Sequence, residues 1–313
     1  ITINLQDMNL SNILELAKQP ALAKGKVDAN VTIPTLVKGE LNIHGYINLN
    51  GITFNDDIMK KVYKVSMPEA MQMNGKVDAN LTDTVIVGSV AMQSNIANID
   101  LKNVEFNRES KYLSSNYSVD IVNLKSLSEL LHTKLDGALV LEGEVEKEKT
   151  LKVTGLTRSL GGEIHYQLSD NNFSSSLLAV PVKNMLSMFR FPAFVDAQAS
   201  GDFGYDLLDK KGNTKLALKE FKLASNNITK SVGMMIMKDP STIVFGETSL
   251  DAAIDGDTIN YTLMAKSMDA SVTIGEGTID KSKDTNEAKI EFAYNKYAVA
   301  ANIEGSLRQP TIG

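Results

Sequence analysis

The chain has no cysteine and no tryptophan, and only 6% of its 313 residues are aromatic. The lack of cysteine excludes disulfide bonds, zinc–thiolate sites and thiol chemistry, and it suits a compartment in which free thiols are oxidised. No apolar run approaches the roughly 18 to 20 residues that span a bilayer. There is no basic block, and the net charge of −6 argues against a nucleic-acid partner, because such a surface displaces no counterions from phosphates.

Recognisable catalytic and metal-binding motifs are also missing. The three histidines, His44, His132 and His165, stand far apart, and none has a second histidine or an acid at ligand spacing. The stretch from Gly275 to Gly277 lacks the third glycine of a phosphate loop, so it is interpreted as a hairpin turn. No serine lies in a G-x-S-x-G or S-x-x-K motif. We therefore predict no catalytic residue, no metal and no cofactor, and we expect that the protein is not an enzyme.

What the sequence does contain is a recurring aliphatic-Asp-small triplet, found each time after a stretch with helical spacing. Two copies lie in the identical hexapeptide Gly-Lys-Val-Asp-Ala-Asn, at 25–30 and 75–80. The repeated acids are Asp28, Asp78, Asp136, Asp196 and Asp251. A calcium site needs several clustered acids and each repeat offers one, so we place these carboxylates on the solvated faces of strands. Self-similarity at such a period indicates an array of units that bury their apolar faces against each other.

Between the helical stretches, apolar and polar residues alternate, which is typical of strands with one dry face. The clearest example is the run Leu41, Ile43, Gly45, Ile47 and Leu49, whose intervening residues are polar. The predicted lining residues of this dry face are Leu41, Ile43, Ile47, Leu49, Ile164, Leu168, Phe203, Ile259, Leu263, Ile290, Phe292, Val299 and Ile303.

Five short stretches instead place apolar residues on one helical face. Their positions are Leu10, Ile13, Leu14 and Ala17; Ile58, Val62 and Val65; Leu124, Leu127 and Leu131; Val182, Met185 and Phe189; and Ile228, Val232, Met235 and Ile236. Four of the stretches end near a proline, which stops a helix. Most methionines lie in or beside them, and methionine adapts to a changing apolar surface. We expect these helices to edge the apolar face, with Leu14, Met185, Phe189 and Met235 at the edge.

The unit is thus a short helix followed by roughly four or five strands of ordinary length. We predict a mainly β fold with short α-helices, in which about five such repeats form one elongated array over 1–313. The approximate repeats are 7–55, 56–122, 123–181, 182–226 and 227–313. Because strand twist accumulates, a long antiparallel sheet curls, and we expect a half-open tube with an apolar groove inside.

These repeats resemble the AsmA-like superfamily of repeating β-groove proteins. The resemblance is carried by the short helix before Gly-x-Val-Asp-Ala, by the segment Leu151 to Gly162 with its paired glycines, and by the ending 303–310. That ending, Ile-Glu-Gly-Ser-Leu-Arg-Gln-Pro, is similar to the Gly-Thr-Leu-x-x-Pro signature of such repeats, with Ser306 in place of threonine.

The resemblance implies a hydrophobic groove that conducts phospholipid acyl chains between the inner and outer membranes across the periplasm. Its expected partners are phospholipid or another acyl lipid, together with inner- and outer-membrane proteins at the two ends. The chain begins at Ile1 without an initiator methionine or a signal peptide. We therefore expect a periplasmic piece of a larger protein, whose inner-membrane anchor lies outside this sequence. The alternative is a structural or chaperone module for outer-membrane protein assembly or envelope integrity.

Overall fold

A computed structural model describes residues 1–35, 41–64, 66–68, 71–128, 130–131, 133–306 and 308–312. The structure is mainly β, with 62% strand and 13% helix, which confirms the predicted class of a β-rich chain with short helices. The chain divides into two compact units, unit 1 (Ile1–Gly155) and unit 2 (Leu156–Gly313). The count of five repeats, their boundaries and the half-open tube stay predictions.

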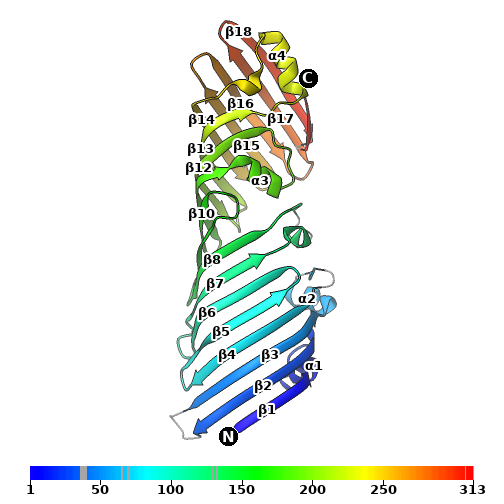
Figure 1. Cartoon of the computed structure of the whole chain (residues 1–313), viewed down its shortest axis with the longest axis vertical. Coiled ribbons are helices and arrows are strands. Elements are labelled where there is room, and N and C mark those ends of the chain that lie inside the picture. Colours follow the sequence, from blue (N-terminus) through cyan, green and yellow to red (C-terminus); the bar gives the residue numbers. More distant parts are fainter. Residues whose placement is uncertain are drawn as a thin grey trace. The chain divides into compact units, whose positions relative to one another are not determined.

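Unit 1 is an antiparallel meander in which each strand pairs with the next one along the chain (Figure 1). Its strands are β1 (Thr2–Asn9), β2 (Ala23–Thr35), β3 (Asn42–Phe54), β4 (Met73–Thr82), β5 (Val85–Ser94), β6 (Ala97–Asn107), β7 (Leu113–Ile121) and β8 (Leu139–Lys147). Strand β9 (Leu151–Thr157) contains the boundary between the two units.

The helical elements of unit 1 lie at one margin of this meander. Helix α1 (Leu10–Leu16) joins β1 to β2, and helix α2 (Asp56–Tyr63) joins β3 to β4. The third predicted helix is a 3-10 turn, η1 (Leu124–Leu127), between β7 and β8. Since every odd-numbered strand ends at this margin, all three connections fall on the same side of the sheet. Two residues named above, Val65 and His132, lie outside the described residues.

The local sequence explains where α2 begins and ends. The side-chain oxygen of Asn55 accepts a hydrogen bond from the Ile58 amide at 3.3 Å, which satisfies one free amide of the first turn. Asp56 and Lys60 form an i,i+4 ion pair of 2.5 Å. Lys64 then adopts a left-handed conformation with φ 60°, which ends the helix.

Unit 2 is also an antiparallel meander in which successive strands pair. Its strands are β10 (Glu163–Ser169), β11 (Asn172–Pro181), β12 (Val195–Asp206), β13 (Lys211–Leu223), β14 (Glu247–Asp255), β15 (Thr258–Lys266), β16 (Ala270–Asp280), β17 (Thr285–Tyr294), β18 (Tyr297–Ser306) and β19 (Gln309–Ile312). Helix α3 (Val182–Met188) joins β11 to β12, while α4 (Asn227–Ile236) and the 3-10 turn η2 (Pro240–Thr242) join β13 to β14.

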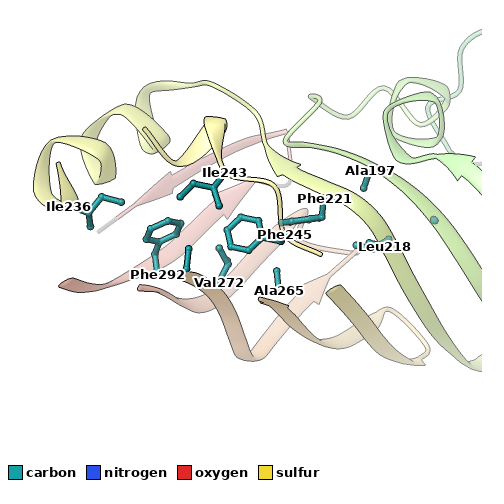
Figure 2. Packing of buried hydrophobic residues seen from close by; sticks show 11 residues of the cluster. Ala197, Leu218, Phe221, Ile236, Ile243, Phe245, Ala265, Val272 and Phe292 are labelled. Carbon is teal, nitrogen blue, oxygen red and sulfur yellow. The ribbon is translucent and has the colours of Figure 1, made fainter. Parts of the chain in front are cut away.

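The main hydrophobic core belongs to unit 2, where the sheet wraps around the connection between β13 and β14 (Figure 2). Phe221 and Phe245 are 1% and 0% exposed, and their rings meet edge to face with centroids 5.8 Å apart. Ile236 of α4 is 1% exposed in the same cluster. Although α4 follows β13, it also contacts β18, so it lies over the face of the sheet rather than beside it.

Unit 1 has a much smaller buried cluster, and it lies at the helix margin. Ala23, Ile52 and Met73 are buried there, and the half-buried side chains packed against them are Leu10, Leu22, Leu49, Phe54 and Met92. Ala23, Ile52 and Met73 come from the helix-margin ends of β2, β3 and β4. The rest of the unit 1 sheet is therefore stabilised mainly by its strand ladder and by cross-strand side-chain pairs.

Candidate functional site

The strand register of unit 1 aligns apolar side chains in continuous rows across the sheet. Directly opposed residues of an antiparallel pair point to the same face, so each row can be followed from strand to strand. One row consists of Leu5, Ala29, Ile47, Val77, Val90, Leu101 and Tyr117. A second row consists of Met8, Val27, Leu49, Gly75, Met92, Ile99, Val119 and Leu141. We call these two rows the unit 1 apolar face.

Most of the unit 1 apolar face is half-buried rather than buried. Leu5 is 38% exposed, and Ile47, Val77, Val90 and Leu101 are all of intermediate exposure. None of these five belongs to the buried cluster at the helix margin, as far as the described residues show. A continuous apolar strip therefore remains accessible to solvent across the strands β1 to β7.

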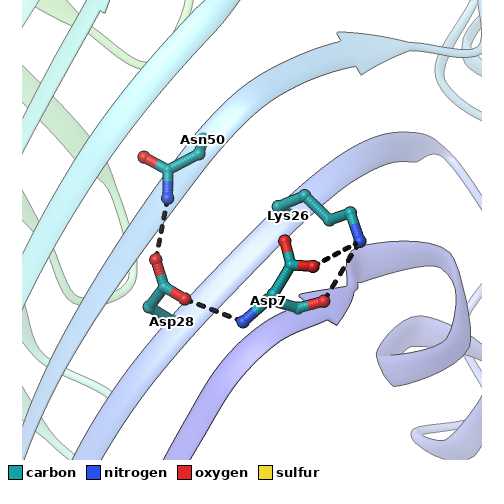
Figure 3. Close-up of polar contacts among 4 residues, drawn as sticks. All are labelled: Asp7, Lys26, Asp28 and Asn50. Carbon is teal, nitrogen blue, oxygen red and sulfur yellow. Dashed lines mark hydrogen bonds and ion pairs between the residues drawn. The ribbon is translucent and has the colours of Figure 1, made fainter.

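The opposite face of unit 1 is polar and carries the first of the repeated acids (Figure 3). One carboxylate oxygen of Asp28 accepts a hydrogen bond from the Asp7 amide at 2.8 Å, and the other accepts one from the Asn50 side chain at 2.9 Å. Lys26 pairs with the Asp7 carboxylate at 3.1 Å. Asp7 has φ 53° at a register shift of β1, so Asp28 stabilises a β-bulge.

A shallow, solvent-open depression of about 510 Å³ lies beside this cluster, on strands β1 to β3. Its lining is Asn4, Leu5, Gln6, Asp7, Asp28, Ala29, Asn30, Tyr46 and Asn48. Six of these nine residues carry an amide or carboxylate side chain, so the depression is less suited to hydrocarbon than the apolar rows are.

Register rows of the same kind cross unit 2. One row consists of Ile164, Leu177, Gly201, Leu216, Leu250, Leu263, Ile274, Ile290 and Ala301. The predicted lining residues Leu168, Phe203, Ile259, Phe292, Val299 and Ile303 fall in neighbouring rows of the same face. We call this the unit 2 apolar face. In unit 1, Ile43, Ile47 and Leu49 likewise share one face, while Leu41 precedes β3.

Part of the unit 2 apolar face is covered by the chain itself. Phe292 is 4% exposed, and Leu263, Ile290 and Val299 pack against the cluster that contains Phe245. Side chains from α4 and from the segment before β14 occupy the space above these residues (Figure 2). This covered part is a protein core rather than an open lining.

Away from α4, the unit 2 apolar face carries aromatic rings. Phe203 meets Phe173 edge to face at 6.0 Å and stacks with Tyr205 at 6.3 Å. The Tyr261 hydroxyl donates to the Asn286 side chain at 2.9 Å, and burial raises the pKa of the phenol. The Tyr261 ring lies over Gly277 of the neighbouring strand, where a Cβ would collide with it. The predicted hairpin turn at 275–277 is therefore wrong, because these residues lie inside β16 at a register shift.

The four predicted edge residues have different surroundings. Leu14 is half-buried on α1, and Met185 of α3 packs against the buried Leu160, Leu177 and Val180. Phe189 is 36% exposed and Met235 is 62% exposed. The role of these four residues as the edge of a groove stays a prediction, and Met235 lies on a helix that covers part of the sheet face.

The carboxyl groups whose pKa values are lowered lie off the two apolar faces. Hydrogen bonding and ion pairing with Lys60 lower the pKa of Asp56, and Arg158 does the same for Glu163. Lys283 and Ser282, in the turn after β16, lower the pKa of Asp280, the last residue of that strand. Within the described part of the chain, no group of three His, Asp or Glu side chains is placed to hold a metal ion.

Some residues of the unit 1 apolar face were not among the predicted lining residues. Val77, Val90, Leu101 and Tyr117 complete the first row. Their signal was the same alternation, which continues through Val85–Ser94 and Ala97–Asn107 but is interrupted by one register shift between these strands.

Comparison with protein-family models, with curated proteins and with solved structures gave no match. Membership of the AsmA-like superfamily therefore stays a prediction. Among the described residues, no helix has the length and hydrophobicity required to cross a bilayer.

Proposed function

We propose that this protein binds the acyl chains of lipid along the unit 1 apolar face. The observation that carries the proposal is the row from Leu5 to Tyr117, which stays half-exposed across the strands β1 to β7. Hydrocarbon covering this strip would remove apolar surface of both partners from water.

The energy scale supports transport as well as binding. Exposing an acyl chain to water costs about 0.8 kcal/mol per methylene. A diacyl lipid with roughly 30 methylenes therefore faces a barrier on the order of 25 kcal/mol in open solution. A row of interchangeable aliphatic residues lowers that barrier at every step, and it offers few polar contacts that would hold the lipid in one place.

The wider proposal is that the protein carries phospholipid between the inner and outer membranes across the periplasm, without chemistry. It would then work with membrane proteins at both ends and with an anchor outside this sequence. The zero cysteine content and the resemblance of the repeats support this placement.

Photocrosslinking from adjacent residues on opposite faces tests the binding step. A photoreactive amino acid at Ile47 should capture phospholipid during expression, identified by mass spectrometry, whereas the same group at Asn48 should capture none. Ile47 lies on the apolar face and Asn48 on the polar one, within the same strand. Equal lipid capture at both positions, or none at either, would reject the proposal.

A second candidate function, strand addition to another polypeptide, is favoured by strand β1. Among the described residues, β1 pairs with β2 alone, and its side chains Ile3 and Leu5 are 44% and 38% exposed. Within β1, the residues Thr2 to Gln6 carry no charge that would block an incoming strand. A photoreactive group at Asn4 that captured protein, with no lipid at Ile47, would favour this function over the first.

A further inference from the structure

A group of exposed apolar side chains lies at the margin of unit 2 where β13 ends and β14 begins. We call the surface formed by Met234, Met235, Met237, Val244 and Met268 the α4 margin. Met234, Met235 and Met237 are 77%, 62% and 82% exposed on α4 and its C-cap. Val244 is 49% exposed before β14, and Met268 is fully exposed in the turn between β15 and β16 at the same margin.

Helix α4 holds this surface in place because its other side belongs to the core. Ile236 is 1% exposed and Thr229 is 6% exposed, and Val232 packs against the same cluster. The Thr229 amide donates to the Asn226 side chain at 3.0 Å, and the Asn226 amide donates to the Thr229 hydroxyl at 2.9 Å. This capping box keeps the helix formed without a partner.

Two lysines accompany the methionines. Lys230 stands one turn before Met234, and Lys238 follows Met237; both are exposed, and neither forms an ion pair among the described residues. Asp239, the acid beside them, is engaged within the chain, because its carboxylate accepts from the Ser241 amide at 2.9 Å and from the Ser241 hydroxyl at 2.7 Å. The outer side of α4 is therefore apolar with two exposed ammonium groups, which also interact electrostatically with the Asp239 carboxylate.

We propose that the α4 margin docks on the surface of an anionic phospholipid bilayer. Flexible apolar side chains beside lysines suit the boundary between acyl chains and headgroups, where methionine enters the apolar layer and ammonium groups meet lipid phosphates. Lysine stems can extend along the apolar surface while their charges stay at the headgroups. A protein groove is the other class of partner, but it would have to match two ammonium groups as well as the methionines.

Docking at the α4 margin would deepen the proposed function by naming the membrane surface as a partner, yet it does not depend on acyl binding by unit 1. The two ideas can therefore fail separately. The full chain is floated with vesicles of phosphatidylethanolamine and phosphatidylglycerol, and in parallel with vesicles of phosphatidylcholine alone.

The test variant changes Met234→Gln, Met235→Gln and Met237→Asn, with asparagine chosen because residue 237 has φ 57°. We expect its bound fraction on anionic vesicles to fall by at least about tenfold. Lys230→Gln with Lys238→Gln should weaken binding several-fold on anionic vesicles and leave the phosphatidylcholine sample unchanged. Lipid capture from Ile47 should persist in both variants.

The matched control is Leu207→Gln with Leu208→Gln, because these side chains are 49% and 75% exposed in the turn between β12 and β13, at the opposite margin of unit 2. Their replacement should leave flotation unchanged. The docking proposal would be overturned by a wild-type chain that does not float, or by an equal loss of flotation in this control. A photoreactive amino acid at Met235 that captured protein and no lipid would overturn it as well. Unchanged thermal unfolding of each variant shows that the fold is intact.

Discussion

The two units use the same strand pattern but treat its apolar face differently. In unit 1 the row from Leu5 to Tyr117 stays half-exposed, and the buried cluster is confined to the helix margin. In unit 2 a comparable row is partly covered by Ile236, Ile243 and Phe245, which come from the connection between β13 and β14. Alternation alone therefore makes an apolar face, and the connections decide whether that face stays open.

The difference lies in residues 224–246 of unit 2. This connection carries a capped helix, a 3-10 turn and Phe245, and it turns back over the sheet. The connections at 10–22 and 55–72 of unit 1 include α1 and α2, which have no fully buried side chain. An open face and a packed face can thus arise from similar strands.

The largest effect should come from deleting a ring in the covered part of unit 2. Phe245→Ala removes a side chain that is 0% exposed and should lower the free energy of unfolding by about 3 to 5 kcal/mol. Val90→Ala, on the half-exposed face of unit 1, should cost roughly 1 kcal/mol. Urea unfolding followed by circular dichroism measures both, and equal costs would contradict the contrast between the units.

A charge on the open face should affect ligand binding more than folding. Val90→Asp places a carboxylate in the unit 1 row and should weaken the binding of a fluorescent fatty acid by about tenfold, since that charge must be desolvated under hydrocarbon. Ser89→Asp is the matched control, because the adjacent residue points to the opposite face of β5. An equal loss in both variants would show that the probe does not bind the apolar face.

Destabilising α4 should expose more of the unit 2 apolar face, as the face of unit 1 is exposed. Asn226→Ala removes the cap of α4 and should destabilise the helix by about 1 kcal/mol. We expect faster amide exchange in α4, read by hydrogen–deuterium exchange mass spectrometry, and increased uptake of the fatty acid probe. Asn55→Ala, at the cap of α2, is the comparison and should leave probe uptake unchanged. Faster exchange without added uptake would mean that α4 does not limit access.

The smallest expected effect is the loss of stability when Asp280 is replaced, and it depends on pH. The pKa of Asp280 is lowered in the folded state, mainly by Lys283, so its contribution to stability is present above the unfolded pKa and is lost as pH falls through the folded value. Asp280→Asn should therefore lower Tm slightly at pH 7, and this deficit should shrink at about pH 2. Thermal scans at both pH values measure this, and a deficit of the same size at both would point to lost turn geometry instead.

Local patterns predicted the elements well. The apolar stretches that begin at Leu10, Ile58, Val182 and Ile228 fall in α1 to α4, and Asn9, Asn55 and Asn226 cap three of these helices. Period-two alternation placed Ile164, Phe203 and Ile290 on one face, because the register preserves side-chain direction across antiparallel strands.

The same sequence patterns could not predict long-range packing. Phe245 follows a 3-10 turn and belongs to no periodic run, so its contact with Phe221 could not be expected from spacing. The stretch from Leu124 to Leu131 has helical spacing, yet among its described residues only Leu124–Leu127 forms a helical turn, and its cap lacks a side-chain hydrogen bond. Strand β1 was also missed, since its pairing with β2 depends on residues about 20 to 30 positions away.

Tyr261, which lies over Gly277, provides an ultraviolet absorbance signal from unit 2. With tryptophan absent, tyrosine dominates the near-ultraviolet absorbance of the whole chain. Burial raises the pKa of Tyr261, so its phenolate should form at a higher pH than that of a free tyrosine. Ligand or membrane contact that reshapes this sheet would then change the ultraviolet absorbance of the tyrosine rings at alkaline pH, without an added dye.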